Sequence, residues 1–268
     1  MPKLLRCPFC SYGRSWILRR HHRKCKRCRR EWSPGTQFPI SGLRLVRREW
    51  LRIIDTFLRD GTILAVSREC HIAYRVAQRA VLTIRMAMAG DFPESFTGTC
   101  EADETYVGGS WKNKAVHIRQ QGSKRGRGTT KQPIFGLAQR DPLRVRVWLL
   151  PDTKRRSLLP KIFGQVVRGS RIYTDGYLPY QSLPSFGYAH DWVDHEAGEY
   201  VRGEVHTQTI DGYWGLLKVH LSGIGGIRKR HLHLFIGEHQ WRSNFRHLTR
   251  KEQTMKIYQL LTRIGGRK

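Results

Sequence analysis

Four cysteines close to the N-terminus constrain how this chain can fold more than any other feature of its sequence. They form two Cys-x-x-Cys pairs separated by fourteen residues, a spacing at which four thiolates can surround one metal ion. A segment of about 40 residues buries little apolar surface, so we expect one structural Zn²⁺ to supply most of its folding free energy. The sequence therefore predicts a zinc ribbon over residues 1–40, with Trp16 and Trp32 as its apolar packing. The predicted zinc ligands are Cys7, Cys10, Cys25 and Cys28.

A helical region follows the predicted ribbon. Residues 33–39 contain two prolines and a glycine, which indicates a linker. Between residues 43 and 90, apolar residues recur largely at helical spacing, with a break at Asp60 and Gly61. Three short helices, the last one rich in arginine, resemble a helix-turn-helix whose final helix enters the major groove of DNA. We assign this region to residues 41–95; a plain helical spacer is the alternative. In the last helix the predicted buried face is Ala77, Val81, Ile84 and Met88, and the arginines are Arg75, Arg79 and Arg85.

From about residue 98 the sequence predicts alternating strands and helices. This order favours an α/β domain with a mixed sheet over residues 96–268. A basic, glycine-rich stretch between the first two strands predicts a long loop. The expected strands are 99–107, 133–139, 145–150, 171–174 and a last one within 192–201, and the expected helices are 157–167, 209–221 and 229–247.

The balance of charge indicates a polyanionic partner. The 268 residues include 49 lysines and arginines against 21 acidic residues, a formal net charge of +28. A surface with this imbalance repels itself unless it meets a polyanion, and nucleic acid is the commonest one. We therefore expect this protein to bind nucleic acid.

The sequence also bears on where the protein acts. No apolar run approaches the roughly 20 residues that a membrane span requires, and the N-terminus lacks the apolar segment of a signal peptide. We expect a cytoplasmic protein without membrane partners, associated with the nucleoid in a prokaryotic cell. Cysteines stay reduced in that compartment, which favours zinc over the alternative of disulfides among the N-terminal cysteines.

Three aspartates lie on strand, strand and helix of the expected α/β domain. Asp103 lies in its first strand, Asp175 at the end of its fourth, and Asp211 in the first turn of the next helix. Each alone is more often a turn former or helix cap, but together they repel one another unless a cation lies among them. Hard oxygen ligands select Mg²⁺ or Mn²⁺, and two such ions about 4 Å apart can promote phosphoryl transfer. Lys218, two helical turns after Asp211, can hold a backbone phosphate near the ions.

Four segments resemble, in order along the chain, motifs of DDE-type insertion-sequence transposases with an N-terminal zinc ribbon. These form the ISXO2-like group, which is related to the eukaryotic Merlin elements, and with the cysteine pairs the resemblance covers nearly the whole chain. It implies a ribonuclease H-like catalytic core with Asp103, Asp175 and Asp211 as the metal ligands. It also implies that a metal-activated water frees a 3′ hydroxyl at the element's end, which then attacks target DNA. The four segments are Glu101–Gly109, Lys131–Gly136, Tyr173–Tyr177 and His206–Lys218.

The last of these motifs departs from the family pattern in two ways. Aspartate stands at position 211 where glutamate is common, and Gln208 stands where many relatives carry asparagine. Because aspartate is one methylene shorter, the third ligand sits differently or acts through a water. Glu238, on the later helix, is a rival third ligand; the spacing and Lys218 favour Asp211.

The predicted function is that of a transposase acting on double-stranded DNA, both element ends and target. Two alternatives stay open. A non-enzymatic regulator built on the ribbon and the helix-turn-helix would explain the charge, but it leaves the α/β domain without a purpose. A nuclease of the same fold would use the same ions without joining DNA. Because two element ends must be held together, we expect a homodimer or larger assembly on DNA.

Overall fold

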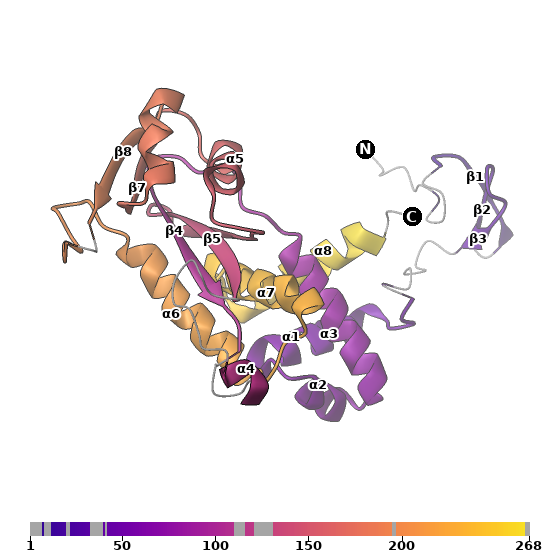
Figure 1. The fold of residues 1–268 in the computed structure, drawn as a ribbon. Coiled ribbons are helices and arrows are strands. Elements are labelled where there is room, and N and C mark those ends of the chain that lie inside the picture. Colours follow the sequence, from indigo (N-terminus) through magenta and orange to yellow (C-terminus); the bar gives the residue numbers. More distant parts are fainter. Residues whose placement is uncertain are drawn as a thin grey trace. The chain divides into compact units, whose positions relative to one another are not determined.

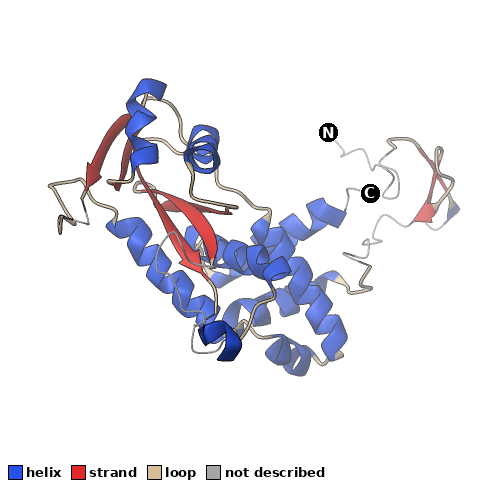
Figure 2. Cartoon of the chain, viewed as in Figure 1, coloured by secondary structure: helices blue, strands red, loops and turns tan. Residues whose placement is uncertain are grey.

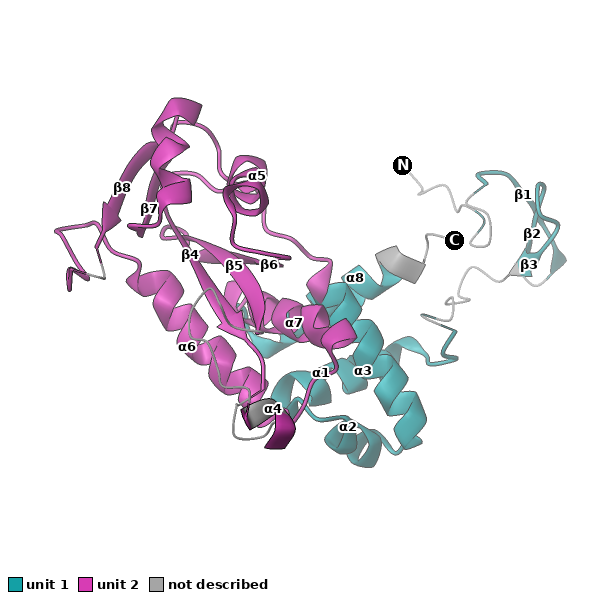
Figure 3. Ribbon diagram, viewed as in Figure 1, with its two compact units in different colours: residues 1–88, 247–268 teal, residues 89–246 magenta. Residues whose placement is uncertain are grey.

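The chain forms two compact units that differ in architecture. The computed structural model describes residues 7, 12–19, 22–32, 40, 42–109, 116–120, 131–194 and 197–265 (Figure 1). The first unit comprises residues 1–88 together with 247–268, and the second comprises residues 89–246 (Figure 3). In this described part, no helix has the length and apolar character to span a bilayer. The three expected domains, 1–40, 41–95 and 96–268, stay a prediction.

The second unit is built on a mixed sheet (Figure 2), which confirms the expected α/β class. Its strands are β4 (Thr99–Val107), β5 (Gln132–Gln139), β6 (Arg144–Leu149), β7 (Arg171–Asp175) and β8 (Ala189–Val193). The order across the sheet is β6–β5–β4–β7–β8. The pairs β4–β5 and β5–β6 are antiparallel, whereas β4–β7 and β7–β8 are parallel. The central strand β4 is therefore paired on both sides.

Helices cover both faces of this sheet. On one face, α5 (Arg155–Gln165) and the 3₁₀ helix η4 (Leu178–Phe186) pack against Phe135 and Leu137 of β5. On the other face, α6 (Gln208–Gly223) and α7 (Leu232–Asn244) pack against Ile134 and Ala138 of the same strand. Successive residues of β5 thus enter different apolar layers, as expected for a strand that is buried on both sides. The unit also contains α4 (Val116–Gln120) and η5 (Lys229–His231).

Side chains of α7 close the edge of the sheet at β6. Val145 N donates to Asn244 Oδ1 at 2.7 Å, and Asn244 Nδ2 donates to Val145 O at 2.9 Å. Val147 N donates to Gln240 Oε1 at 2.8 Å. An edge strand otherwise leaves such backbone groups without partners. The two amide side chains therefore substitute for a further strand.

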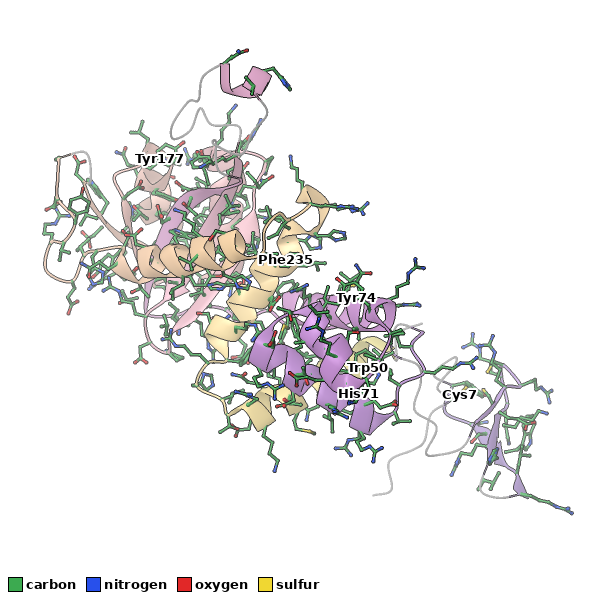
Figure 4. All side chains as sticks on the ribbon, turned by 90° about the horizontal axis from the view of Figure 1, so that it is seen from below. Cys7, Trp50, His71, Tyr74, Tyr177 and Phe235 are labelled. Atoms are coloured by element: carbon green, nitrogen blue, oxygen red, sulfur yellow. The ribbon has the colours of Figure 1, made fainter. Side chains whose placement is uncertain are left out.

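The helical part of the first unit consists of α1 (Arg47–Asp60), α2 (Ile63–Cys70), α3 (Tyr74–Ala89) and α8 (Arg250–Gly265). α1 ends at Gly61, whose φ of 80° is the left-handed conformation that closes a helix. Thr62 then caps α2, because its hydroxyl accepts a hydrogen bond from Ala65 N at 3.1 Å. His71 and Tyr74 flank the short turn before α3 (Figure 4). The predicted buried face of α3 is confirmed, since Ala77, Val81, Ile84 and Met88 are each 0% exposed.

A small antiparallel sheet lies in the N-terminal 40 residues. Its strands are β1 (Ser15–Ile17), β2 (Arg23–Cys25) and β3 (Glu31–Trp32), in the order β1–β2–β3. Trp16 does not pack beneath this sheet as expected. It is 38% exposed, and Lys26 and Arg29 lie over its ring, 5.5 and 4.9 Å from the centroid. Cationic side chains therefore cover this ring in place of an apolar layer. The side chain of Trp32 lies outside the described residues.

Candidate active site

The structure brings Asp103 and Asp175 together at the centre of the mixed sheet. β7 runs parallel to β4 and pairs Tyr173 with Glu101, so two further residues along each strand place the two aspartates side by side. Their carboxylate oxygens and one of Glu104 all lie within 4.8 Å of one another. Tyr177 N donates to Asp175 Oδ1 at 3.2 Å, which fixes this carboxylate at the end of β7 (Tyr177 is labelled in Figure 4).

Glu104 is a member of this acidic group that the sequence interpretation missed. Adjacent residues of a strand point to opposite faces, which predicts that Glu104 turns away from Asp103. Its carboxylate nevertheless reaches the group, where it accepts a hydrogen bond from the hydroxyl of Tyr180 in η4. The pairing of β4 with β7 ends at Glu101, so Glu104 lies beyond the paired part of this edge of β4.

The electrostatics of Asp103 reflect its crowded surroundings. Partial burial raises the pKa of Asp103, and the charges of Asp211 and Asp175 raise it further, to about 7. A hydrogen bond from Trp214 Nε1 to Asp103 Oδ2, 2.7 Å long, opposes this change in pKa. Carboxylates held this close disfavour one another's ionisation, and a bound cation would relieve that cost. The arrangement has the donor set of a divalent metal site.

Asp211 lies near this group without being part of it. It sits in the first turn of α6, exposed, and its Oδ2 accepts a hydrogen bond from Thr207 Oγ1 at 2.9 Å. Among the described residues, the group of mutually close ligand atoms contains Asp103, Glu104 and Asp175 but not Asp211. Its charge still contributes to the raised pKa of Asp103. Lys218 is exposed further along α6.

Glu238, the rival third ligand, is engaged elsewhere. It is 2% exposed on α7, and Arg242 Nε donates to its Oε1 at 2.9 Å. It does not join the acidic group. Its carboxylate is held instead by an ion pair within α7.

Gly136 makes room for the contact between Trp214 and Asp103. It is paired with Asp103 across β4 and β5, and a Cβ atom at Gly136 would lie 2.6 Å from two ring atoms of Trp214. It would also lie 2.9 Å from Ile210 Cδ1. Only glycine lets α6 approach the sheet this closely, so the aromatic ring lies directly against the strand.

Gly136→Ala is therefore expected to lower the free energy of unfolding by about 1–3 kcal/mol, because the added methyl group overpacks the α6 interface. Urea denaturation followed by circular dichroism measures this loss. Gly164→Ala is the matched control: no atom lies within 4 Å of a Cβ there, and it lies in helix α5. Alanine favours a helix, so this control is expected to be neutral or stabilising by up to about 1 kcal/mol. Equal stability of the Gly136 variant and the wild type would contradict the packing argument.

Three of the four predicted zinc ligands lie together in the N-terminal segment, and one of them, Cys25, ends β2. The Sγ atoms of Cys7, Cys25 and Cys28 are all within 4.8 Å of one another, and those of Cys7 and Cys28 are 3.6 Å apart. Arg27 N and Cys28 N donate to Cys25 Sγ at 3.3 and 3.4 Å. None of the described cysteines forms a disulfide. Cys10, the fourth predicted ligand, lies outside the described residues.

Comparison with known proteins identifies the family. Residues 95–244, more than half of the chain, match the family model of the ISXO2-like transposase domain. The chain belongs to this transposase family. An uncharacterized protein in transposable element ISH50 of Halobacterium salinarum is 30% identical over 265 residues, covering 88% of this chain and 84% of that protein. An uncharacterized transposase-like protein of Haemophilus influenzae is 29% identical over 96 residues, covering 36% of this chain and 77% of that protein.

A weak likeness to one solved structure accompanies these matches. The simian T-cell lymphotropic virus intasome in complex with PP2A regulatory subunit B56 gamma has a TM-score of 0.36 and 13% sequence identity. The likeness covers 74% of this chain and 69% of that one.

All the acidic candidates lie inside the matched transposase domain, whereas the cysteine group precedes it. The domain also holds a buried glutamate that the sequence interpretation missed. Glu101, on the same face of β4 as Asp103, is 0% exposed and forms an ion pair with Arg140, with Nε 2.7 Å from Oε1. Membership of a transposase family indicates an enzyme that cleaves DNA.

Proposed function

We propose that this protein cleaves DNA at the ends of its element and joins the freed 3′ hydroxyl to target DNA. The observation that carries the proposal is the placement of Asp103 beside Asp175 at the centre of the sheet. The charge of Asp211 is also close enough to raise the pKa of Asp103. We infer that Asp103, Asp175 and Asp211 hold two Mg²⁺ or Mn²⁺ ions in a ribonuclease H-like core. Carboxylate oxygens are the ligands that these hard cations prefer.

Bound at these carboxylates, the two ions would activate the attacking oxygen and stabilise the leaving oxygen of the scissile phosphate. The chain's own residues have distinct parts in this scheme. Trp214 fixes Asp103 by donating to its Oδ2, and Tyr177 N fixes Asp175. Lys218, exposed on α6, is suited to hold a phosphate of the DNA backbone as a point charge.

The N-terminal part of the chain would supply recognition of the element ends. Zn²⁺ bound by Cys7, Cys10, Cys25 and Cys28 would form a zinc ribbon; tetrahedral ligands about 2.3 Å from zinc lie roughly 3.8 Å apart, close to the 3.6 Å between Cys7 and Cys28. α2 and α3, joined by a short turn, have the order of a helix-turn-helix, and Arg75 and Arg79 are exposed on α3.

The net charge of +28 suits double-stranded DNA as the partner. Because both ends of the element must be held for joining, the working assembly is a homodimer or larger. Such an assembly acts on the nucleoid, in the cytoplasm of a prokaryotic cell. We keep 1–40, 41–95 and 96–268 as the proposed limits of ribbon, helix-turn-helix and catalytic domain.

Labelled DNA from the flanking ends of the gene, mixed with the full chain and Mg²⁺ or Mn²⁺, tests this function. The wild type is expected to release a 3′ hydroxyl at a defined end and to join it to a second duplex. Asp175→Asn is expected to reduce both products about a thousandfold, since metal ions contribute several kcal/mol to the transition state. Binding of the end, measured by fluorescence anisotropy, is expected to persist in the variant.

Other outcomes would select a different function. Tight binding without metal and intact DNA under every condition would contradict the enzyme and favour a regulator. Cutting without a joined product at any target would favour a nuclease of the same fold.

A further inference from the structure

We propose that Glu101 and Arg140 form a clamp that positions Asp211 for metal binding. This inference rests on the proposed function, because it assumes that Asp211 is the third metal ligand. Both clamp residues act through Asp211, so they are positioning residues and do not touch DNA or metal.

The carboxylate of Glu101 is fully used by the chain itself. Its Oε1 accepts from Arg140 Nε at 2.7 Å and from Thr209 Oγ1 at 2.8 Å, and its Oε2 accepts from Ile210 N at 3.0 Å. The side chain is 0% exposed. A carboxylate in this state has no approach for a cation, which separates Glu101 from the acidic group two residues along the same strand.

The bond to Ile210 N fixes the first turn of α6 against β4. The first amide groups of a helix have no partner within the helix, and a negative charge is favoured there by the helix dipole. Glu101 supplies both the acceptor and the charge, from a strand 109 residues earlier in the chain. Asp211 immediately follows Ile210, and Asp103 is two residues from Glu101. The hydrogen bond between Glu101 and Ile210 therefore joins the two segments of backbone that carry Asp103 and Asp211.

Arg140 extends this attachment to the segment that leads into α6. Its Nη1 donates to Glu204 O at 2.9 Å, and its Nη2 donates to His206 O at 3.0 Å. Nη2 also lies 2.9 Å from His206 Nδ1. Because an arginine can only donate, this ring nitrogen is the acceptor and the proton of a neutral His206 is on Nε2. The guanidinium lies over the ring of Tyr173, with 4.8 Å to its centroid.

The chemistry of this pair favours positioning over a purely stabilising role. Burying two charges costs about as much as their attraction returns, so an apolar pair of the same volume would stabilise the fold as well. What an apolar pair cannot do is fix a helix terminus through directed hydrogen bonds to the backbone. The clamp connects β4, the end of β5 and the start of α6, which are the elements that bring Asp211 towards Asp103.

The test uses Glu101→Gln in the full chain and measures Mn²⁺ binding by electron paramagnetic resonance. The variant is expected to bind Mn²⁺ about 10–100-fold more weakly, the usual effect of removing a residue that orients a metal ligand. The amides of Ile210 and Asp211 are expected to lose protection from hydrogen exchange. Glu101→Asp, which keeps the charge, is expected to recover part of the Mn²⁺ affinity.

Glu238→Gln is the matched control, because Glu238 is also a buried glutamate that is ion-paired with an arginine. It is expected to lose stability like Glu101→Gln but to bind Mn²⁺ as the wild type does. Arg140→Lys provides a second route should Glu101→Gln not fold. It keeps the charge but loses the forked contacts to Glu204 and His206, and it is expected to weaken Mn²⁺ binding at least about tenfold.

Wild-type Mn²⁺ affinity in Glu101→Gln, or in Arg140→Lys where that variant replaces it, would overturn the clamp and leave the proposed function intact. An equal loss in Glu238→Gln would also overturn it, since the effect would then follow from general destabilisation. A wild type that neither binds Mn²⁺ nor cuts DNA would refute the proposed function, and the positioning role would fail with it.

Discussion

Replacing Asp211 with asparagine is expected to lower the rate of metal-dependent DNA cleavage about a thousandfold and to leave the fold intact. The carboxylate is exposed and accepts a hydrogen bond from Thr207 Oγ1, which an asparagine oxygen can also accept. Stability therefore changes little, whereas a lost metal ligand removes several kcal/mol of transition-state stabilisation. Single-turnover cleavage of labelled element ends, at saturating protein, measures the chemical step.

Glu238→Gln decides between the two candidates for the third ligand. Glu238 is buried and paired with Arg242, so its replacement is expected to destabilise the protein while cleavage below the melting temperature stays close to wild type. A thousandfold loss in Glu238→Gln together with normal cleavage by Asp211→Asn would reverse the assignment. Losing cleavage in Glu104→Gln but not in Asp211→Asn would instead place the third ligand on β4, where Glu104 joins the acidic group.

The strands that carry the site could be predicted because the residues within and next to them are typical of strands and of the turns that end them. Thr99–Val107 and Arg171–Asp175 are short runs ending at glycine, and both were expected within one residue of their observed bounds. The last strand was placed wrongly, within 192–201, whereas β8 is Ala189–Val193. Trp192 does lie in β8, but Tyr200 and Val201, which extend the expected strand beyond it, are 63 and 46% exposed outside any strand. Exposed apolar residues mimic a strand that tertiary structure does not use.

The C-terminal helix α8 was not predicted, because its role depends on a distant partner. Ile257 and Leu261, four residues apart, are each 0% exposed, yet most of the surrounding helix is polar. α8 contacts α1, about 200 residues earlier in the chain. Sequence periodicity shows that a helix has an apolar face, but it does not show which element covers that face.

Some residues of the candidate site could likewise be predicted from local sequence, whereas others depend on contacts between distant parts of the chain. The order of Asp103, Asp175 and Asp211 on strand, strand and helix was readable, and the parallel pairing of β4 with β7 explains why the first two meet. Glu101 was overlooked because its partners, Arg140, Thr209 and Ile210, come from other elements. The available signal was a glutamate two residues before Asp103, on the same face of the predicted strand. A buried charge of this kind indicates a specific partner.

Removing the metal proposed for the N-terminal cysteines is expected to unfold the sheet β1–β2–β3 and leave the other elements folded. Among the described residues of this segment, the buried cluster consists of Cys7 and Cys25, with Cys28 partly buried against them. Strands of two or three residues, with only this thiol cluster buried among the described residues, lack the free energy to order themselves. Zinc bound by four cysteines contributes about 10–16 kcal/mol, and this binding energy is also the folding energy of the segment.

Cys25→Ser is the variant with the largest expected effect, because Cys25 is 0% exposed and its Sγ also accepts hydrogen bonds from Arg27 N and Cys28 N. Purified wild type is expected to release a single zinc ion per chain to a chelator, measured with a colorimetric dye, and Cys25→Ser to release none. Amide signals of residues 12–32 should collapse to unfolded positions in the variant's NMR spectrum. Cys70→Ser, which alters a partly buried thiol of α2, should keep both the zinc and the signals. Folded signals in Cys25→Ser without zinc would mean that packing alone holds the structure of the segment. That result would contradict the proposal that metal binding by the cysteines folds it.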